Sequence, residues 1–213
     1  MPPPFFPSPS LFSRRRALHT LGALPMAWLG SASAAQGRDH EVLRPLFAPQ
    51  LALCPEGPPL QLNGAGIRYK AMFRVYAAGL YLPQPAQNLE EVEQQTGCKR
   101  IAITMLRKIE ATELGNLFIQ GIHANSAPHL VQGLLPNMLR MGEVFARNKT
   151  LEPGQNFCLD RIPDKGMVLR VDDVAQPEPF EGPFFDALLR IWLGERPADR
   201  HLKAALLAAS SRL

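Results

Sequence analysis

Two segments dense in aromatic, aliphatic and β-branched residues, 72–82 and 99–107, constrain the fold of this chain more than any other feature. The first reads MFRVYAAGLYL and the second KRIAITMLR, and both have the composition of β-strands. Pro83 and Pro85 end the first segment, because proline has no backbone N–H to give to a neighbouring strand. In the second segment, hydrophobic side chains alternate at Ile101, Ile103 and Met105. The chain is therefore expected to contain a sheet with a buried face.

The other predicted elements follow one another in groups of strands and groups of helices. Segments 156–161 and 167–172 flank the turn sequence Pro-Asp-Lys-Gly and predict a β-hairpin. Hydrophobic residues at helical spacing predict helices at 88–96, 114–122, 128–147, 184–193 and 202–206, with Pro136 expected to split or kink the third. Hairpin-joined strands with grouped helices indicate an α+β domain rather than an alternating βαβ fold.

The N-terminal residues have the pattern of an export signal. Three arginines at 14–16 precede an apolar, uncharged run at 17–30, and the small residues Ser-Ala-Ser-Ala end at position 34. Cleavage after Ala34 and a periplasmic location are expected, by a twin-arginine-like or a Sec signal. A transmembrane anchor is the alternative, but the run is short and Pro25 interrupts it, so no stable membrane span is expected after cleavage.

The charge balance argues against a nucleic-acid partner. The whole chain of 213 residues carries 23 basic and 19 acidic side chains, a formal charge of +4. Removal of the predicted signal, 1–34, also removes three arginines and leaves the mature chain close to neutral. No run of lysine or arginine remains that would bind a phosphate backbone.

Three parts are expected along the chain. The predicted signal is followed by a proline-rich linker or arm at 35–59 and by one domain at 60–213. In an oxidising compartment, the three cysteines Cys54, Cys98 and Cys158 allow at most one internal disulfide, whose partners the sequence does not identify.

The sequence contains none of the common motifs for a metal, a nucleotide or a catalytic serine. No histidine pair has the spacing of a zinc site, and no G-x-S-x-G segment is present. Gly64 and Gly66 lack the rest of a phosphate-binding fingerprint, and we interpret them as residues of a tight turn between two strands. No cofactor and no metal are therefore expected.

Three longer segments carry a family resemblance. The segments 62–68 (LNGAGIR) and 73–82 (FRVYAAGLYL) resemble the opening strands of the chalcone isomerase family. The segment 187–194 (ALLRIWLG), followed by Pro197 and Asp199, is similar to the C-terminal helices of its bacterial, exported branch. The resemblance implies an open-faced β-sandwich, in which a long, curved, mostly antiparallel sheet carries a layer of helices on one face and ligands bind in the cleft between them.

The same resemblance suggests which residues face a ligand. Arg68 matches the arginine with which plant members hold an anion during the cyclisation of a chalcone, and a guanidinium is suited to an oxyanion or a carboxylate. Tyr76 replaces a catalytic threonine of those enzymes and offers a hydroxyl, or else is a core tyrosine. Thr104 and Arg107 are further candidates on the third strand, or structural residues. The remaining plant catalytic residues have no match.

Three functions are therefore considered. The first is binding of a small apolar ligand with an anionic, fatty-acid-like head, as in the non-catalytic relatives. The second is an isomerase of the chalcone isomerase (intramolecular lyase) type acting on a phenolic or enone substrate, with Arg68 and Tyr76 as its catalytic residues. The third is a non-catalytic interaction protein of the cell envelope whose cleft is filled by its own side chains.

Overall fold

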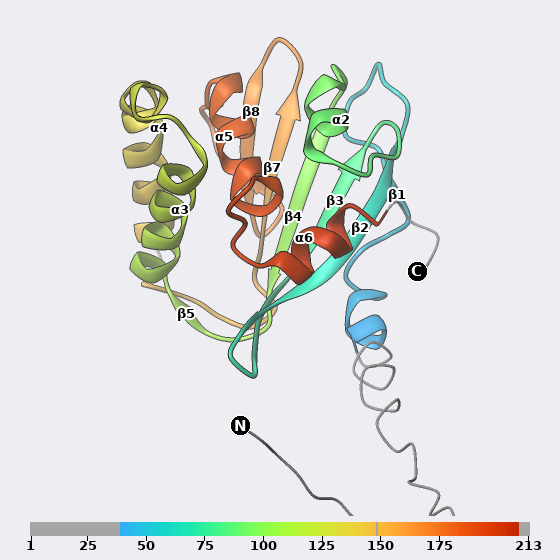
Figure 1. Cartoon of the computed structure of the whole chain (residues 1–213), viewed down its shortest axis with the longest axis horizontal. Helices are drawn as coiled ribbons and strands as arrows, with labels where there is room; N and C mark the ends of the chain where they lie inside the picture. The colour runs from blue at the N-terminus through green and yellow to red at the C-terminus, as the bar shows by residue number, and fades with distance from the viewer. Residues whose placement is uncertain (1–38, 148, 209–213) are drawn as a thin grey trace, which may run out of the picture.

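A seven-stranded sheet, in which every strand pair is antiparallel, organises the part of the chain that the computed structural model describes, residues 39–147 and 149–208 (Figure 1). The strand order is β1-β2-β3-β4-β7-β8-β9. These strands are β1 (Gln50–Leu51), β2 (Leu60–Lys70), β3 (Phe73–Leu82), β4 (Lys99–Met105), β7 (Asn156–Ile162), β8 (Gly166–Val171) and β9 (Val174–Ala175). The predicted signal, 1–34, lies outside the described residues and stays a prediction.

One face of this sheet carries the helices. They are α2 (Leu89–Gln94), α3 (Ala111–Asn125), α4 (Pro128–Ala146), α5 (Gly182–Leu193) and α6 (Arg200–Leu206). In Figure 1, α5 lies over β7 and β8, and α6 crosses β2 and β3. The α+β prediction is confirmed, and so is the hairpin of β7 and β8. None of the helices in the described part of the chain combines the length and hydrophobicity that a membrane crossing requires.

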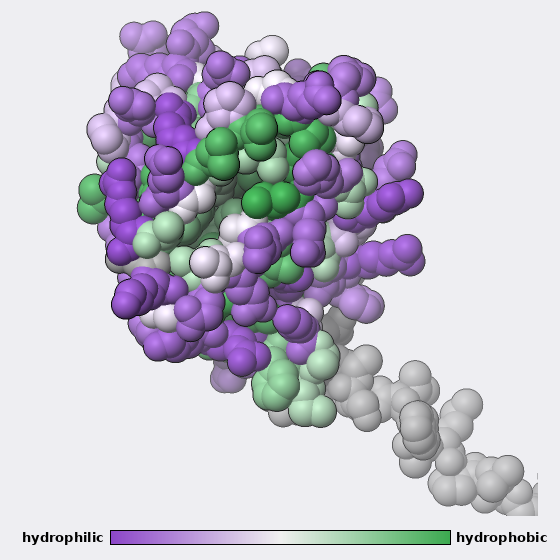
Figure 2. Space-filling view, turned by 90° about the vertical axis from the view of Figure 1, so that its left-hand side faces the viewer, coloured by the Kyte–Doolittle hydropathy of each residue, from purple (hydrophilic) through white to green (hydrophobic). Residues whose placement is uncertain are grey.

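Helices α3 and α4 form an antiparallel pair that packs beside α5. The short strands β5 (Ile109–Glu110) and β6 (Thr150–Leu151) pair with each other just before α3 and just after α4. Pro136 does not split α4, which continues past it to Ala146, so that part of the prediction is wrong. Seen from the side of this pair, hydrophobic side chains border a hollow on the molecular surface (Figure 2).

The two faces of the sheet bury separate hydrophobic clusters. Ile101, Ile103 and Met105 of β4 are at most 1% exposed and belong to the cluster beneath the helices. On the opposite face, Ala77 and Tyr81 of β3 belong to the second cluster. The alternation that predicted a buried sheet face is therefore confirmed, and both faces of the central strands are covered.

The second cluster is covered by the predicted arm. Its described part, residues 39–59, begins with a helical turn at 39–43 and buries Leu43 and Phe47, each 4% exposed. The Phe47 ring lies against Gly79 of β3, where a Cβ atom would come within 2.8 Å of the ring. A disulfide between Cys54 and Cys98 joins the arm to the start of β4, and Cys158 is free and buried. The arm is thus attached to the sheet by burial and by a covalent bond.

The glycines at 64 and 66 lie inside strand β2 and not in a turn, so our turn interpretation is wrong. Their role is to let α6 approach the strand. A Cβ on Gly66 would lie 2.7 Å from the Cβ of Ala205, and one on Gly64 would lie 2.7 Å from the backbone oxygen of Leu206. Only residues without a side chain permit this contact.

A bulge at Asn63 fixes the end of α6 on the same strand. The pairing of β2 with β3 skips Asn63, which is 2% exposed. Its side-chain nitrogen donates to the backbone oxygens of Ala86 and Leu206, at 2.9 and 2.7 Å, and its oxygen accepts from the Ala86 amide at 2.7 Å. One buried amide therefore connects β2, the segment after β3 and the C-terminal helix.

Replacement of Gly64 by alanine tests this contact. We expect Gly64→Ala to lower the free energy of unfolding by about 1–3 kcal/mol, because the new methyl group must push α6 away from β2. Gly133→Ala on α4 is the control: its Cβ meets nothing within 4 Å, so it should stabilise the helix by about 0.5–1 kcal/mol. Urea denaturation of the two variants measures both changes, and equal effects would contradict the role of Gly64.

Candidate functional site

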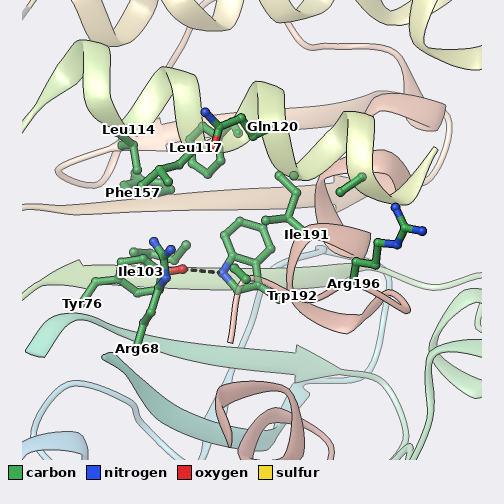
Figure 3. A pocket seen from close by; sticks show the side chains of 14 residues that line it. Arg68, Tyr76, Ile103, Leu114, Leu117, Gln120, Phe157, Ile191, Trp192 and Arg196 are labelled. Carbon is green, nitrogen blue, oxygen red and sulfur yellow. Dashed lines mark hydrogen bonds between the residues drawn. The ribbon is translucent and has the colours of Figure 1, made fainter. Parts of the chain in front are cut away.

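A cavity of about 200 Å³ lies between the sheet and the helices α3 and α5 (Figure 3). Its wall is mainly hydrophobic, with strand residues on one side and helix residues on the other: Ile103, Leu114, Leu117, Phe118, Phe157 and Ile191. The polar side chains that line it are Arg68, Tyr76, Gln120, Trp192 and Arg196. The cavity is therefore an apolar space with a few polar groups at defined positions, as in most small-molecule sites.

Arg68 and Tyr76 are brought together by the register of β2 and β3. Their Cα atoms are direct partners across the two strands, so both side chains project toward the helix layer. The guanidinium carbon lies 5.6 Å from the centre of the tyrosine ring, within the range of a cation–π contact. A second register shift, at which the pairing of β2 with β3 skips Val75, occurs directly beside this pair. Such bulges change the direction in which neighbouring side chains point, here at the cavity wall.

The Tyr76 hydroxyl is held by the tryptophan of α5. The Nε1–H of Trp192 donates to it at 2.9 Å, and both side chains are at most 3% exposed. Burial raises the pKa of Tyr76, while the positive charge of Arg68 acts in the opposite direction. The hydroxyl therefore stays protonated at neutral pH. Because it accepts from Trp192, its own proton remains available to a ligand in the cavity.

The guanidinium of Arg68 has an unmet hydrogen-bonding capacity. Its Nε is buried and has no hydrogen-bond partner, and no carboxylate among the described residues forms an ion pair with Arg68. The nearby carboxylate of Asp199 is engaged elsewhere, because it accepts the amide N–H groups of Tyr69, His201 and Leu202. An arginine cannot lose its proton in a protein, so the cavity wall carries a permanent positive charge without a counter-charge in contact.

Two of the four predicted site residues are misplaced. Ile103 faces the cavity, and the next residue of β4, Thr104, points to the opposite face because strand side chains alternate. Arg107 lies beyond the end of β4, exposed, with its guanidinium over the ring of Phe73. The assignment of Thr104 and Arg107 to the ligand site is therefore wrong, whereas Arg68 and Tyr76 do line one cavity.

Trp192 and Arg196 line the site although the sequence did not predict them there. The sequence predicted Trp192 only as part of a hydrophobic helix face. The available clue was its indole N–H, because a buried N–H group needs a hydrogen-bond acceptor nearby. Arg196 follows α5 in an irregular segment. The side-chain nitrogen of Asn125 donates to the backbone oxygen of Arg196, and the side-chain oxygen of Asn125 accepts from the Arg196 amide, both at 2.9 Å. No local pattern marks that position.

The ionisable side chains on the cavity wall are those of Arg68, Tyr76 and Arg196. Within the described residues that line it there is no carboxylate, imidazole or thiol. The same part of the chain has no cluster of histidine, cysteine and acidic side chains that would hold a metal ion. The arrangement can bind an anion beside an apolar surface, with Arg68 and Tyr76 as hydrogen-bond donors.

The comparisons with known proteins agree with this architecture. A sequence model described as chalcone isomerase-like matches residues 49–208. The chain belongs to the chalcone isomerase-like family. A crystal structure of a fatty-acid binding protein from Arabidopsis thaliana is similar to it, with a TM-score of 0.57 and 13% sequence identity over 76% of this chain and 90% of that one. At that identity the likeness shows the shared fold. No curated protein matches the sequence.

The predicted fold of this chalcone isomerase-like chain is thereby confirmed in its main features. The sheet is antiparallel in every pairing, helices cover one face, and the cavity lies between the two layers. The match begins at residue 49, so it includes β1 and the part of the arm that carries Cys54. The family domain thus begins slightly earlier than the domain start at residue 60 that the sequence predicted.

Loss of the Tyr76 hydroxyl is expected to destabilise the protein through Trp192. In Tyr76→Phe the buried indole N–H has no acceptor, which should cost about 1–3 kcal/mol of the free energy of unfolding. The double variant Tyr76→Phe, Trp192→Phe removes both partners and should show coupling, with a smaller loss than the sum of the two single variants. Urea denaturation followed by circular dichroism measures the three variants, and additive losses would show that this hydrogen bond contributes nothing.

Proposed function

We propose that this protein binds a small, mainly apolar ligand with an anionic head, of the fatty-acid type, and that it does so without catalysis. The observation that carries this proposal is the Arg68 guanidinium, which faces an apolar cavity and has a buried Nε without a partner. A carboxylate is a suitable occupant, since it accepts hydrogen bonds from the guanidinium and from the Tyr76 hydroxyl together.

The dimensions and the fold neighbour support this ligand class. The similar Arabidopsis structure is named a fatty-acid binding protein. The cavity of about 200 Å³ is smaller than the roughly 300–1,000 Å³ of sites for drug-sized ligands, so it suits a carboxylate head and the first part of an alkyl chain. Hydrophobic side chains form most of its wall, which favours an alkyl chain over a strongly polar molecule.

The two alternatives receive less support. An isomerase of the chalcone type is disfavoured because Arg68 is the one plant catalytic residue with a match here, while Tyr76 stands in place of the catalytic threonine. A cleft filled by its own side chains is disfavoured by the open volume beside Phe118 and Tyr76. Binding of a carboxylate ligand requires only the groups that are present.

Substitution of Arg68 tests the binding proposal. We expect Arg68→Gln to weaken the binding of laurate by about tenfold to a hundredfold, because a charge-assisted hydrogen bond is lost. Binding of dodecanol, which has the same chain and no charge, should change little. Isothermal titration calorimetry measures both ligands, and native mass spectrometry identifies any lipid that copurifies.

Arg107→Gln is the matched control, because it removes an arginine that lies outside the cavity. It should leave the affinity for laurate unchanged. If Arg68→Gln binds laurate as well as the unmodified protein does, the carboxylate does not contact Arg68 and the proposal is wrong. Turnover of a chalcone that disappears in Arg68→Gln would instead favour the isomerase.

We also propose that the protein is exported to the periplasm and that its signal is removed after Ala34. The arginine triplet at 14–16, the apolar run and the small residues before position 35 support this proposal. The Cys54–Cys98 disulfide supports it independently, since such bonds persist in oxidising compartments and are rare in the cytosol.

Processing of the N-terminus tests the export proposal. Protein from the periplasmic fraction should begin at Ala35 in intact-mass analysis and should carry one disulfide. Replacement of Arg14 and Arg15 by lysine should abolish export if the twin-arginine route is used and leave it intact if the Sec route is used. Recovery of the whole chain from the cytosol, with all cysteines reduced, would contradict the proposal.

A further inference from the structure

We propose that the alkyl tail of the ligand passes the ring of Phe118 into a groove between α3 and α4, and that this groove sets the chain length that the protein accepts. The inference rests on the proposed function, because it concerns the tail of a ligand whose head lies at Arg68. The groove is a second space in the molecule, next to the cavity in which the head group is proposed to bind.

The second space is a gap of about 30 Å³ between α3, α4 and α5. Its wall is entirely hydrophobic or glycine, from residues such as Ile122, Met138, Met141 and Leu188. Phe118 lines both this gap and the cavity that contains Arg68. Phe118 therefore borders both spaces, and the side of the molecule that carries α3 and α4 is hollowed and bordered by hydrophobic residues (Figure 2).

Two glycines in the middle of helices keep this gap open. Gly115 of α3 and Gly142 of α4 both line it, and a Cβ at either position would meet nothing within 4 Å. Glycine inside a helix costs about 1 kcal/mol relative to alanine. At Gly64 and Gly66 close packing explains the absence of a side chain, but at Gly115 and Gly142 no neighbouring group of the protein requires it. Space for a ligand tail is a reason that fits both positions.

The side chains around the gap are able to make room. About 30 Å³ is the volume of one water molecule, so an alkyl chain enters only if Phe118 turns aside. Met138 and Met141 are unbranched and adapt easily to a new neighbour. The ring of Phe118 makes tilted or edge contacts with Phe145, Phe157 and Trp192, at 5.9 to 6.0 Å between ring centres. These contacts hold the ring beside the two spaces, and it must give up part of them when it turns aside.

Filling the groove from α4 tests the inference directly. Gly142→Leu places a hydrophobic side chain in the gap, at a helical position where added atoms have room and where leucine favours the helix. The matched control is Gly133→Leu, the same change on the same helix. Gly133 also has nothing within 4 Å, but it lines a different hollow with Ser126 and Arg190. Binding of octanoate and of palmitate to each variant is measured by titration calorimetry.

In the unmodified protein, affinity should rise by up to roughly fourfold for each CH2 group that becomes buried. We expect Gly142→Leu to weaken palmitate binding by about tenfold or more and to leave octanoate binding within about twofold, because only the longer tail reaches the groove. Gly133→Leu should change neither. Phe118→Ala should increase the preference for palmitate over octanoate, since it opens the passage between the two spaces.

Each other outcome overturns the inference. Unchanged palmitate binding in Gly142→Leu would mean that the tail leaves the cavity by another route, and equal weakening of both acids would mean that the effect is not on chain length. In either case the dependence of laurate binding on Arg68 would still support the proposed function. If neither acid binds the unmodified protein, the proposed function and the inference both fail.

Discussion

A guanidinium that faces an apolar cavity, with a buried Nε that has no hydrogen-bond partner and no carboxylate in contact, is able to receive an anion, and our interpretation of the molecule depends on this interaction. A buried N–H group loses its contact with water, and a hydrogen bond compensates for that loss. Arg68 has a buried Nε without one, although its neighbour Asp199 caps α6 within the same region. The fold positions the cation through the β2–β3 register and fixes the adjacent hydroxyl of Tyr76 through Trp192. The two hydrogen-bond donors therefore have fixed positions at the cavity wall.

The two faces of the sheet are covered differently, one by the arm and the other by the helices. The face under the arm is closed by burial of Leu43 and Phe47 and by the Cys54–Cys98 disulfide. On that face, further along the sheet, the fully buried carboxylate of Asp160 on β7 pairs with arginines from both neighbouring strands. The face under the helices holds the main hydrophobic cluster and also the cavity. Because the closed face stabilises the sheet, the helix layer can contain an open cavity.

The sequence brought together two residues that line one cavity where they are close together in the chain, and their contact with a ligand stays a prediction. Arg68 and Tyr76 lie on neighbouring strands of one hairpin, and the family resemblance covered both. Thr104 was assigned wrongly because a shift of one position along a strand reverses the face, and the sequence alone did not establish which face of β4 meets the helices. Trp192 and Arg196 reach the site from α5 and from the segment after it, more than a hundred residues away in sequence from Tyr76, so no local pattern connected them with the cavity.

The sequence by itself determined the positions of β3, β4, the β7–β8 hairpin and the helices, and the α+β class, because these depend on composition, periodicity and turn residues within short windows. The family followed from the resemblance of longer segments, whereas the glycines of β2 were misinterpreted as a turn. Tertiary structure alone decided which cysteines pair, why Gly64 and Gly66 lack side chains, and where Arg68 and Tyr76 meet the helix layer. It also decided that Gly115 and Gly142 border an empty gap, while the glycines of β2 are packed against α6. These features depend on contacts between distant parts of the chain, and no pattern within a short stretch of sequence predicts such a contact.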